Sequence, residues 1–231
     1  MATKKLYKKV KFKTRKEWLA GRRIGGSSAS ALFGSNPYMT ILDVYCAAVN
    51  PNINEDEDEV KTSSQEYGIS AENLIREIVK LNFADKFNVI SPKGFEMYVR
   101  KDKPYLTATL DGILQAIIGD EKWILEIKTH DVLNKEDLLN WENQLPQNYF
   151  IQNLHYQVVL NDFAGSICVA KLRFFKFEED GTRVLDKEEI RYYRMPRKDF
   201  QRDIVLLEKV ETDFYEQHIA KHIPPNIKIK L

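Results

Sequence analysis

Residues 123–130, WILEIKTH, alternate like a β-strand but carry two charges within an otherwise apolar run. Successive side chains of a strand point to opposite faces, so Glu126 and Lys128 share one face and Ile127 points to the other. A carboxylate and an ammonium on so apolar a strand must be solvated, paired with each other or bound to a ligand. The stretch is therefore either a surface ion pair on an exposed sheet or part of a functional site.

A further acidic residue, Asp111, lies in the preceding apolar stretch, LTATLDGILQAII at residues 106–118, which we predict to be one strand. The Gly-Asp pair at residues 119–120 is typical of a tight turn, so the two stretches are expected to pair as a hairpin. This pairing would bring Asp111 close to Glu126. Neighbouring carboxylates repel unless a cation or proton lies between them, and hard oxygen ligands suit Mg²⁺ or Mn²⁺. A lysine beside them, here Lys128, can deprotonate or orient a water molecule.

Residues 63–83 are predicted to form an amphipathic helix, because apolar side chains recur with the helical period. These side chains are Ala71, Leu74, Ile75, Ile78 and Val79. Glu72 lies at the edge of this stripe, about 20° from Val79 at about 100° per residue. It can therefore supply a third carboxylate, and an Asp, a Glu-x-Lys and a helical Glu together suit phosphodiester hydrolysis.

The remaining pattern predicts a mixed α/β domain. Two helical pieces are expected within residues 27–49, interrupted at residues 34–38, with Ser27 or Ser28 as the first N-cap. The other expected elements are a strand at 95–100, a helix beginning near Pro146, strands at 166–178 and 188–196, and a C-terminal helix at 197–223.

The composition is that of a globular protein, with 231 residues of which 43% are hydrophobic and 11% aromatic. We expect a single domain over residues 1–231. No apolar run approaches the roughly 20 residues that span a bilayer, and no apolar segment follows the basic N-terminus, so neither a membrane span nor a secretory signal is expected. Cys46 and Cys168 suit free thiols in a reducing compartment, which favours the cytoplasm.

Charge is distributed unevenly, although the formal net charge is only +1. Ten of the first 23 residues are Lys or Arg, and Glu17 alone opposes them. Residues 1–16 are therefore predicted to be a basic N-terminal arm, which either binds phosphate or is a solvated, frayed terminus. Residues 50–64 contain the run EDEDE and are predicted to be an acidic exposed loop.

Five motifs in this order resemble the YqaJ and lambda-exonuclease type of viral recombination nuclease, within the PD-(D/E)xK superfamily. They are GRRIGGSSASALFG (21–34), YGISAENLI (67–75), TLDGIL (109–114), LEIKT (125–129) and YFIQNLHYQVVL (149–160). The resemblance covers roughly residues 17–162. It implies an α/β fold with a restriction-endonuclease-like core, in which helices flank a central mixed β-sheet.

The resemblance also implies the role of each residue at the carboxylate site. Asp111, Glu126 and the backbone carbonyl of Ile127 would bind divalent metal, and Glu72 would complete the metal site directly or through water. Two Mg²⁺ or Mn²⁺ ions are expected, and Lys128 would activate the attacking water.

Further roles are implied by the same resemblance. Gln152 would support the active site. The pocket for a terminal 5′-phosphate would be formed by Arg22 or Arg23, Ser27 or Ser28, and Thr109. The sequence departs from the superfamily motif at Leu110, where a proline would precede the aspartate.

The activity implied is metal-dependent 5′-to-3′ exonuclease action on linear double-stranded DNA, leaving 3′ single strands for recombination by strand annealing. The implied partners are DNA ends, a single-strand annealing protein and two further copies of this chain in a homotrimer. A phage-encoded protein of this type would act in the bacterial host cytoplasm.

Three alternatives remain. One is another PD-(D/E)xK nuclease, either a repair endonuclease or a Cas4-like enzyme, although two cysteines cannot hold the four-cysteine iron–sulfur cluster usual in the latter. The second is a non-catalytic DNA-end-binding module on the same fold. The third is a structural α/β protein with a surface ion pair.

Overall fold

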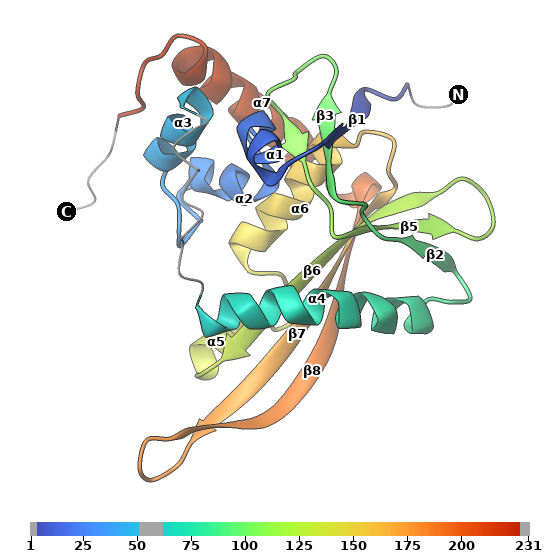
Figure 1. Ribbon diagram of the computed structural model, residues 1–231, viewed down its shortest axis with the longest axis vertical. Coiled ribbons are helices and arrows are strands. Elements are labelled where there is room, and N and C mark those ends of the chain that lie inside the picture. The colour runs from blue at the N-terminus through green and yellow to red at the C-terminus, as the bar shows by residue number, and fades with distance from the viewer. Residues whose placement is uncertain (1–3, 51–61, 227–231) are drawn as a thin grey trace.

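Two β-sheets and the helices around them form the molecule (Figure 1); the computed structural model describes residues 4–50 and 62–226. The larger sheet has five strands in the order β2-β5-β6-β7-β8, and the smaller has three in the order β1-β3-β4. The larger sheet comprises β2 (Phe87–Ile90), β5 (Gly112–Ala116), β6 (Lys122–Val132), β7 (Gly165–Phe177) and β8 (Arg183–Pro196). The smaller comprises β1 (Tyr7–Phe12), β3 (Phe95–Arg100) and β4 (Thr107–Ala108).

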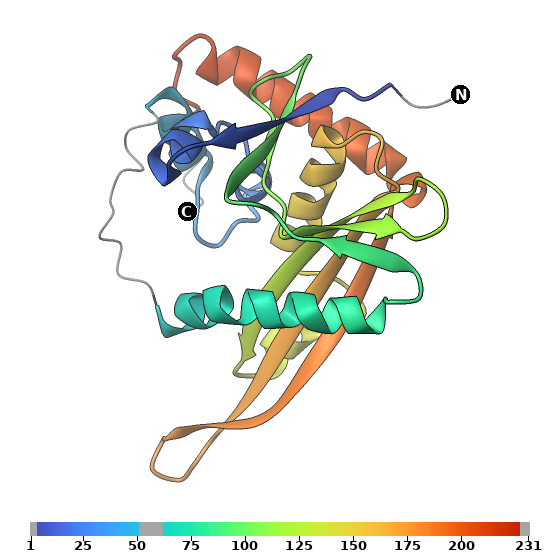
Figure 2. The same cartoon turned by 45° about the vertical axis from the view of Figure 1, so that its right-hand side comes forward.

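The larger sheet is mixed and is flanked by helices on both faces. Strands β6 and β7 run parallel, whereas β5 and β8 pair antiparallel to their neighbours. Helix α4 (Ser63–Asn82) lies along one face and α6 (Gln147–Val159) along the other, as Figures 1 and 2 show. Helix α7 (Gln201–Phe214) packs on the outer side of α6. The expected α/β fold, with helices flanking a central mixed sheet, is confirmed.

Helix α4 forms where the apolar periodicity predicts it. Thr62 and Gln65 make a capping box that satisfies free backbone N–H groups at its first turn. Ala71, Ile75 and Val79 are buried against β6 and β7, as expected. The prediction for Leu74 is wrong, because its side chain is 68% exposed.

The stretch predicted as one strand over residues 106–118 is broken, which is the main correction to the predicted fold. Thr107 and Ala108 pair with β3 in the small sheet, whereas Gly112–Ala116 pair with β6 in the large one. Residues 109–111 cross between the two sheets. Asp111 therefore lies at a crossing, not in the middle of a strand. The expected hairpin is confirmed, because β5 pairs antiparallel with β6 around the turn that includes Gly119.

The described part of the predicted basic arm over residues 1–16 is not a frayed terminus, whereas its binding of phosphate stays a prediction. Residues Tyr7–Phe12 are β1, the edge strand of the small sheet, and α1 (Arg15–Gly21) follows with Thr14 as its N-cap. The arm contains the alternating apolar positions of an edge strand, but its lysines obscure them in the sequence.

The next segment is helical in two pieces, as predicted. Helix α2 (Gly26–Ala29) continues into a 3₁₀ turn, η1 (Ser30–Phe33), and α3 (Ile41–Val49) follows a break. Gly34 ends the first piece with φ 64°, a left-handed conformation that favours glycine. The N-cap of α2 is Gly25, so the prediction of Ser27 or Ser28 as the cap is wrong.

The C-terminal half follows the predicted order. Pro146 is the N-cap of α6, and β7 and β8 form a long hairpin that projects beyond the sheet (Figure 2). Strand β8 begins at Arg183, earlier than expected, and a short α5 (Lys135–Asn140) is added after β6. The helix predicted over 197–223 consists of η3 (Arg197–Asp199), α7 and a π-helical turn, η4 (Tyr215–Ile219).

Most of the acidic loop predicted at residues 50–64 lies outside the described residues, although Ser63 and Ser64 belong to α4. Cys46 and Cys168 are free thiols, as expected. Within the described ranges, no helix is both long enough and apolar enough to cross a bilayer.

Candidate functional site

A cleft of about 460 Å³ opens where the two sheets meet, between α4 and α6. It collects side chains from α4, the 109–111 crossing, β6, α6 and the segment after α1. All the predicted site residues except Arg23 and Ser28 line it, namely Arg22, Ser27, Glu72, Thr109, Asp111, Glu126, Ile127, Lys128 and Gln152. The fold thus brings together residues that are far apart in the sequence.

Asp111 and Glu126 form the acidic centre of the cleft. Because Gly112 pairs with Leu125, the preceding Asp111 is placed beside Glu126, and its Oδ2 accepts a hydrogen bond from Ile127 N at 2.7 Å. Glu126 is 2% exposed, and its Oε2 has no hydrogen-bond partner among the described residues. An unsatisfied buried carboxylate oxygen is costly, so one that lies in a cleft is a candidate ligand for a cation.

Burial raises the pKa of both carboxyl groups. The pKa of Asp111 lies well above its usual range, first because of burial and then because of the negative charge of Glu126. Burial likewise raises the pKa of Glu126, although the ammonium of Lys128 partly opposes this. A cation between the two carboxylates would relieve both effects.

Lys128 lies on the same face of β6 as Glu126 and is paired with it. Its Nζ is 2.6 Å from Glu126 Oε1 and lies 5.0 Å from the centre of the Tyr149 ring. Burial alone would lower the pKa of Lys128, but the negative charge of Glu126 outweighs this and raises it. Lys128 is therefore a cation in this arrangement, suited to donating hydrogen bonds to an anion or a water molecule.

Arg76 is a residue of the site that the sequence did not reveal. Its Nε donates to the backbone carbonyl of Asp111 at 2.9 Å, and its guanidinium pairs with Glu72 one turn earlier on α4. Its side chain is only 6% exposed. The available signal was an arginine next to Ile75, within the apolar stripe of α4. Arg76 ties the 109–111 crossing to α4 and holds Glu72 at the border of the cleft.

Helix α6 supplies Gln152 and Tyr156 from successive turns. Gln152 Nε2 donates to Glu126 Oε1 at 2.8 Å and to Tyr156 Oη at 2.6 Å, and the supporting role of Gln152 stays a prediction. Tyr156 was not predicted, although its place four residues after Gln152 on a helix puts it on the same face. Gly26 of α2 lies so close that a Cβ there would be 2.5 Å from the Tyr156 ring.

The other side of the cleft carries the residues expected to bind phosphate. Arg22 Nη2 lies 3.4 Å from Ser27 Oγ, and its guanidinium lies 5.1 Å from the centre of the Trp18 ring. In the described part of the chain, Arg22 has no carboxylate within ion-pair distance. An arginine without a carboxylate partner in a cleft can bind an anion.

The structure distinguishes the pairs of residues that the sequence left open. Arg23 donates to the backbone carbonyls of Ala20 and Arg22 and does not line the cleft, so Arg22 is the candidate arginine. Ser28 Oγ accepts from the backbone N–H of Gly25, so Ser28 closes the first turn of α2 instead of binding in the cleft. Ser27 and Thr109 remain as the hydroxyl-bearing candidates.

The donor set fits a hard divalent cation at Asp111 and Glu126. Both are carboxylates in one cleft, and Glu126 Oε2 has no other partner. Across residues 4–50 and 62–226, no three His, Cys, Asp or Glu side chains already converge on one point. The ion pair of Glu72 with Arg76 explains why a third carboxylate does not converge there. The two carboxylates and the Ile127 carbonyl remain as candidate oxygen ligands for a metal.

Comparison with known proteins gives a family match and likenesses to solved structures, two of which are described here. The model of the YqaJ-like viral recombinase domain matches residues 15–162. One of these solved structures is a crystal structure of an alkaline exonuclease, LHK-Exo, from Laribacter hongkongensis, with 13% sequence identity and a TM-score of 0.48. The match covers 90% of this chain and 99% of the LHK-Exo chain. The structure of LHK-Exo in complex with dAMP is 11% identical over the same shares, with a TM-score of 0.49. No curated protein matches the chain.

Proposed function

Because this chain belongs to the YqaJ-like viral recombinase domain family, we propose that it is a metal-dependent nuclease that hydrolyses phosphodiester bonds in DNA. The observation that carries the proposal is the buried pair Asp111 and Glu126 beside Lys128 in one cleft. A surface ion pair would not bury two carboxylates together and leave one of their oxygens without a partner.

The residues of the cleft suit phosphoryl transfer to water. Mg²⁺ or Mn²⁺, expected as two ions, would be held by Asp111, Glu126 and the Ile127 carbonyl, with Glu72 completing the site directly or through water, and would polarise the phosphate and acidify a bound water. Lys128, as a cation, would orient the attacking water and stabilise negative charge that develops on the phosphate.

Two side chains fix the orientation of this machinery. Gln152 holds Glu126 Oε1, and Arg76 holds the backbone of Asp111, so both carboxylates are oriented before substrate binds. This preorganisation is the main protein contribution to catalysis at such sites.

The finer proposal is a 5′-to-3′ exonuclease on linear duplex DNA that leaves 3′ single strands for annealing. Arg22, Ser27 and Thr109 would bind the terminal 5′-phosphate, and the unpaired Arg22 guanidinium supports this assignment. A homotrimer around DNA and cooperation with a single-strand annealing protein rest on the family resemblance alone.

The first test compares linear duplex DNA bearing 5′-phosphate or 5′-hydroxyl ends, with Mg²⁺ or with EDTA. We expect Mg²⁺-dependent digestion that prefers 5′-phosphate ends and falls by at least about 100-fold in Lys128→Ala. Lys171→Ala is the matched control, because Lys171 also pairs with a glutamate on the same sheet but lies outside the cleft. Its activity should equal that of the unmodified protein.

Other outcomes separate the alternatives. Digestion that ignores the end group, or that cuts closed circles, would keep the nuclease and reject the exonuclease. DNA binding without digestion in any divalent metal would reject the nuclease and favour the end-binding module.

A further inference from the structure

A buried histidine and glutamate join three elements behind the cleft. His155 of α6 and Glu211 of α7 are both 0% exposed, and His155 Nδ1 lies 2.5 Å from Glu211 Oε1. The other ring nitrogen, Nε2, lies 2.8 Å from the backbone carbonyl oxygen of Thr107 in β4. The imidazole therefore links α7, α6 and the small sheet at one point.

The proton positions can be deduced from the partners. A carbonyl oxygen only accepts, so His155 Nε2 must carry a proton. The short contact on Nδ1 then requires a second proton, which lies either on the imidazole or on Glu211. Burial alone favours a neutral imidazole, but the charge and hydrogen bond of Glu211 and the Thr107 carbonyl outweigh it and raise the pKa of His155.

The bond to Thr107 matters because Thr107 begins the segment that leads into the cleft. Thr109, two residues later, lines the cleft, and so does Asp111, two residues further on. His155 also lies between Gln152 and Tyr156 in the sequence of α6. Its hydrogen bond to Thr107 therefore fixes the distance between that helix and the crossing segment. We propose that Glu211 holds His155 as an imidazolium that positions residues 107–111 against α6, making both of them positioning residues for the cleft.

The surroundings contain few other groups that could set the charge of His155. Glu211 faces it from α7, Arg22 acts on it from the segment after α1, and the Tyr156 ring lies 6.1 Å away on its own helix. Arg22 opposes the positive charge, so Glu211 is the group that sustains it.

The expected pH dependence has a defined sign. Because the folded-state pKa of His155 is raised, its contribution to stability is complete below the unfolded value of about 6.5. That contribution is lost as the pH rises through the folded-state pKa. The linkage should therefore appear as a decline in stability as the pH rises above about 6.5.

The direct test is nitrogen NMR of the imidazole in the full chain, with ¹⁵N-labelled histidine and without DNA. We expect both nitrogens of His155 to show the shifts of protonated nitrogens at pH 7, whereas an unprotonated nitrogen at pH 7 would overturn the proposal. This measurement does not depend on nuclease activity, so it stands even if the proposed function fails.

Variants test the positioning role, which rests on the proposed function. Glu211→Ala should lower the rate of DNA digestion about 10-fold, as loss of an outer partner of an active site does. Glu211→Gln can still hydrogen-bond a neutral imidazole, so it should keep the activity that Glu211→Ala loses. Its stability should no longer decline as the pH rises above about 6.5. A folded Glu211→Ala protein with full activity, or Glu211→Gln with an unchanged pH profile, would contradict the role.

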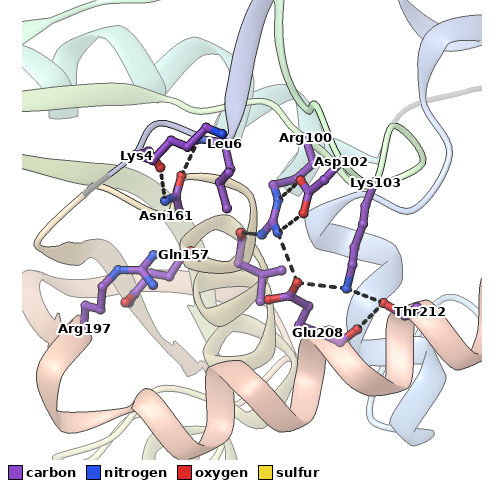
Figure 3. A network of polar contacts seen from close by, with 11 residues as sticks. Lys4, Leu6, Arg100, Asp102, Lys103, Gln157, Asn161, Arg197, Glu208 and Thr212 are labelled. Carbon is purple, nitrogen blue, oxygen red and sulfur yellow. Dashed lines mark hydrogen bonds and ion pairs between the residues drawn. The ribbon is translucent and has the colours of Figure 1, made fainter. Parts of the chain in front are cut away.

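The control is Glu208→Gln, one turn earlier on α7. Glu208 pairs with Arg100 at 3.1 Å and Lys103 at 2.9 Å in the network of Figure 3, whereas His155 pairs with Glu211. This variant perturbs the docking of α7 without touching the imidazole. In this variant, the nitrogen shifts of His155 and the decline in stability with rising pH should match those of the unmodified chain. A loss of either would show that the docking of α7, not Glu211, sets the charge of His155.

Discussion

At the scale of single residues, the cleft holds buried carboxylates whose negative charge lowers the stability of the fold. Asp111 and Glu126 are buried side by side, and the pKa of each is raised mainly by burial. Lys128 neutralises only part of this charge. Sites of this kind reduce stability in return for function, so substitutions there can stabilise the fold and abolish activity together.

Asp111→Asn should show this trade-off. The folded-state pKa of Asp111 is raised, so its carboxylate costs stability as the pH rises above the unfolded value of about 3.9. Asparagine keeps an oxygen that can accept from Ile127 N but carries no charge. We expect the metal-free variant to be roughly 1–2 kcal/mol more stable at pH 8, with no gain at pH 4 and no nuclease activity. Urea unfolding at both pH values measures this.

Asp43→Asn is the control of opposite sign. Hydrogen bonds from Thr40 lower the pKa of Asp43 at the start of α3, so its charged form is favoured by folding. This substitution should destabilise the protein at neutral pH. A destabilised Asp111→Asn would show that Asp111 is a structural residue.

Gly26→Ala should disturb the cleft through packing alone. A Cβ at residue 26 would lie 2.5 Å from the Tyr156 ring and 2.9 Å from Gln152 Cγ, so α2 and α6 would have to separate. We expect a loss of about 1–3 kcal/mol in stability together with reduced activity. Gly25→Ala is the adjacent control, since its nearest contact would be the flexible end of Arg22 at 3.4 Å. Equal effects at both positions would contradict the packing explanation.

At the scale of elements, the apolar periodicity predicted the long helices and the strands that carry the site. It failed at residues 106–118, because both sheets bury apolar residues and nothing local marks the crossing between them. It also missed β1, whose lysines resemble a solvated arm. Arg76 and Asp111 are 35 residues apart, so their contact is a property of the assembled fold that no local pattern contains.

The docking of α7 offers a prediction at this scale. Arg100 of β3 is 3% exposed; its guanidinium pairs with Asp102 and with Glu208 of α7 and donates to the carbonyl of Val158 in α6 (Figure 3). Arg100→Ala would leave the buried Val158 carbonyl without this donor, whereas Asp102 and Glu208 stay in contact with solvent, so we expect it to cost about 1–3 kcal/mol in urea unfolding.

The exposed pair Lys209 and Asp213 on the same helix provides the comparison. Lys209→Ala should cost less than about 0.5 kcal/mol, because solvent screens such pairs. Similar losses at Arg100 and Lys209 would rule out a special role for the buried network.

At the scale of the whole molecule, the proposed affinity for DNA cannot come from net charge, which is only +1. It must depend on the positions of individual cationic side chains. Arg22 is a cationic side chain that has no carboxylate partner in the described chain. The sequence anticipated most of the cleft because hairpin register and strand alternation fix Asp111, Glu126 and Lys128 relative to one another. It could not choose between Arg22 and Arg23, since that choice depends on how α1 ends.

The salt dependence of DNA binding tests this distribution of charge. If Arg22 binds a phosphate, Arg22→Ala should reduce the slope of log affinity against log salt by about 1, at every sequence tested. Lys209→Ala on the exposed side of α7 should leave the slope unchanged. An unchanged slope in Arg22→Ala would remove Arg22 from the DNA-binding surface.

The lysines of β1 have a consequence for how copies of the protein behave in a crowded solution. An edge strand presents unpaired backbone groups that can recruit another strand and begin aggregation. Lys8, Lys9 and Lys11 lie along this edge, and Lys9 is paired with Glu96 of β3. A second copy approaching the edge would have to bury the like charges of Lys8 and Lys11 against each other. The same residues that resemble a nucleic-acid-binding arm in the sequence thus keep the small sheet from growing beyond its own chain.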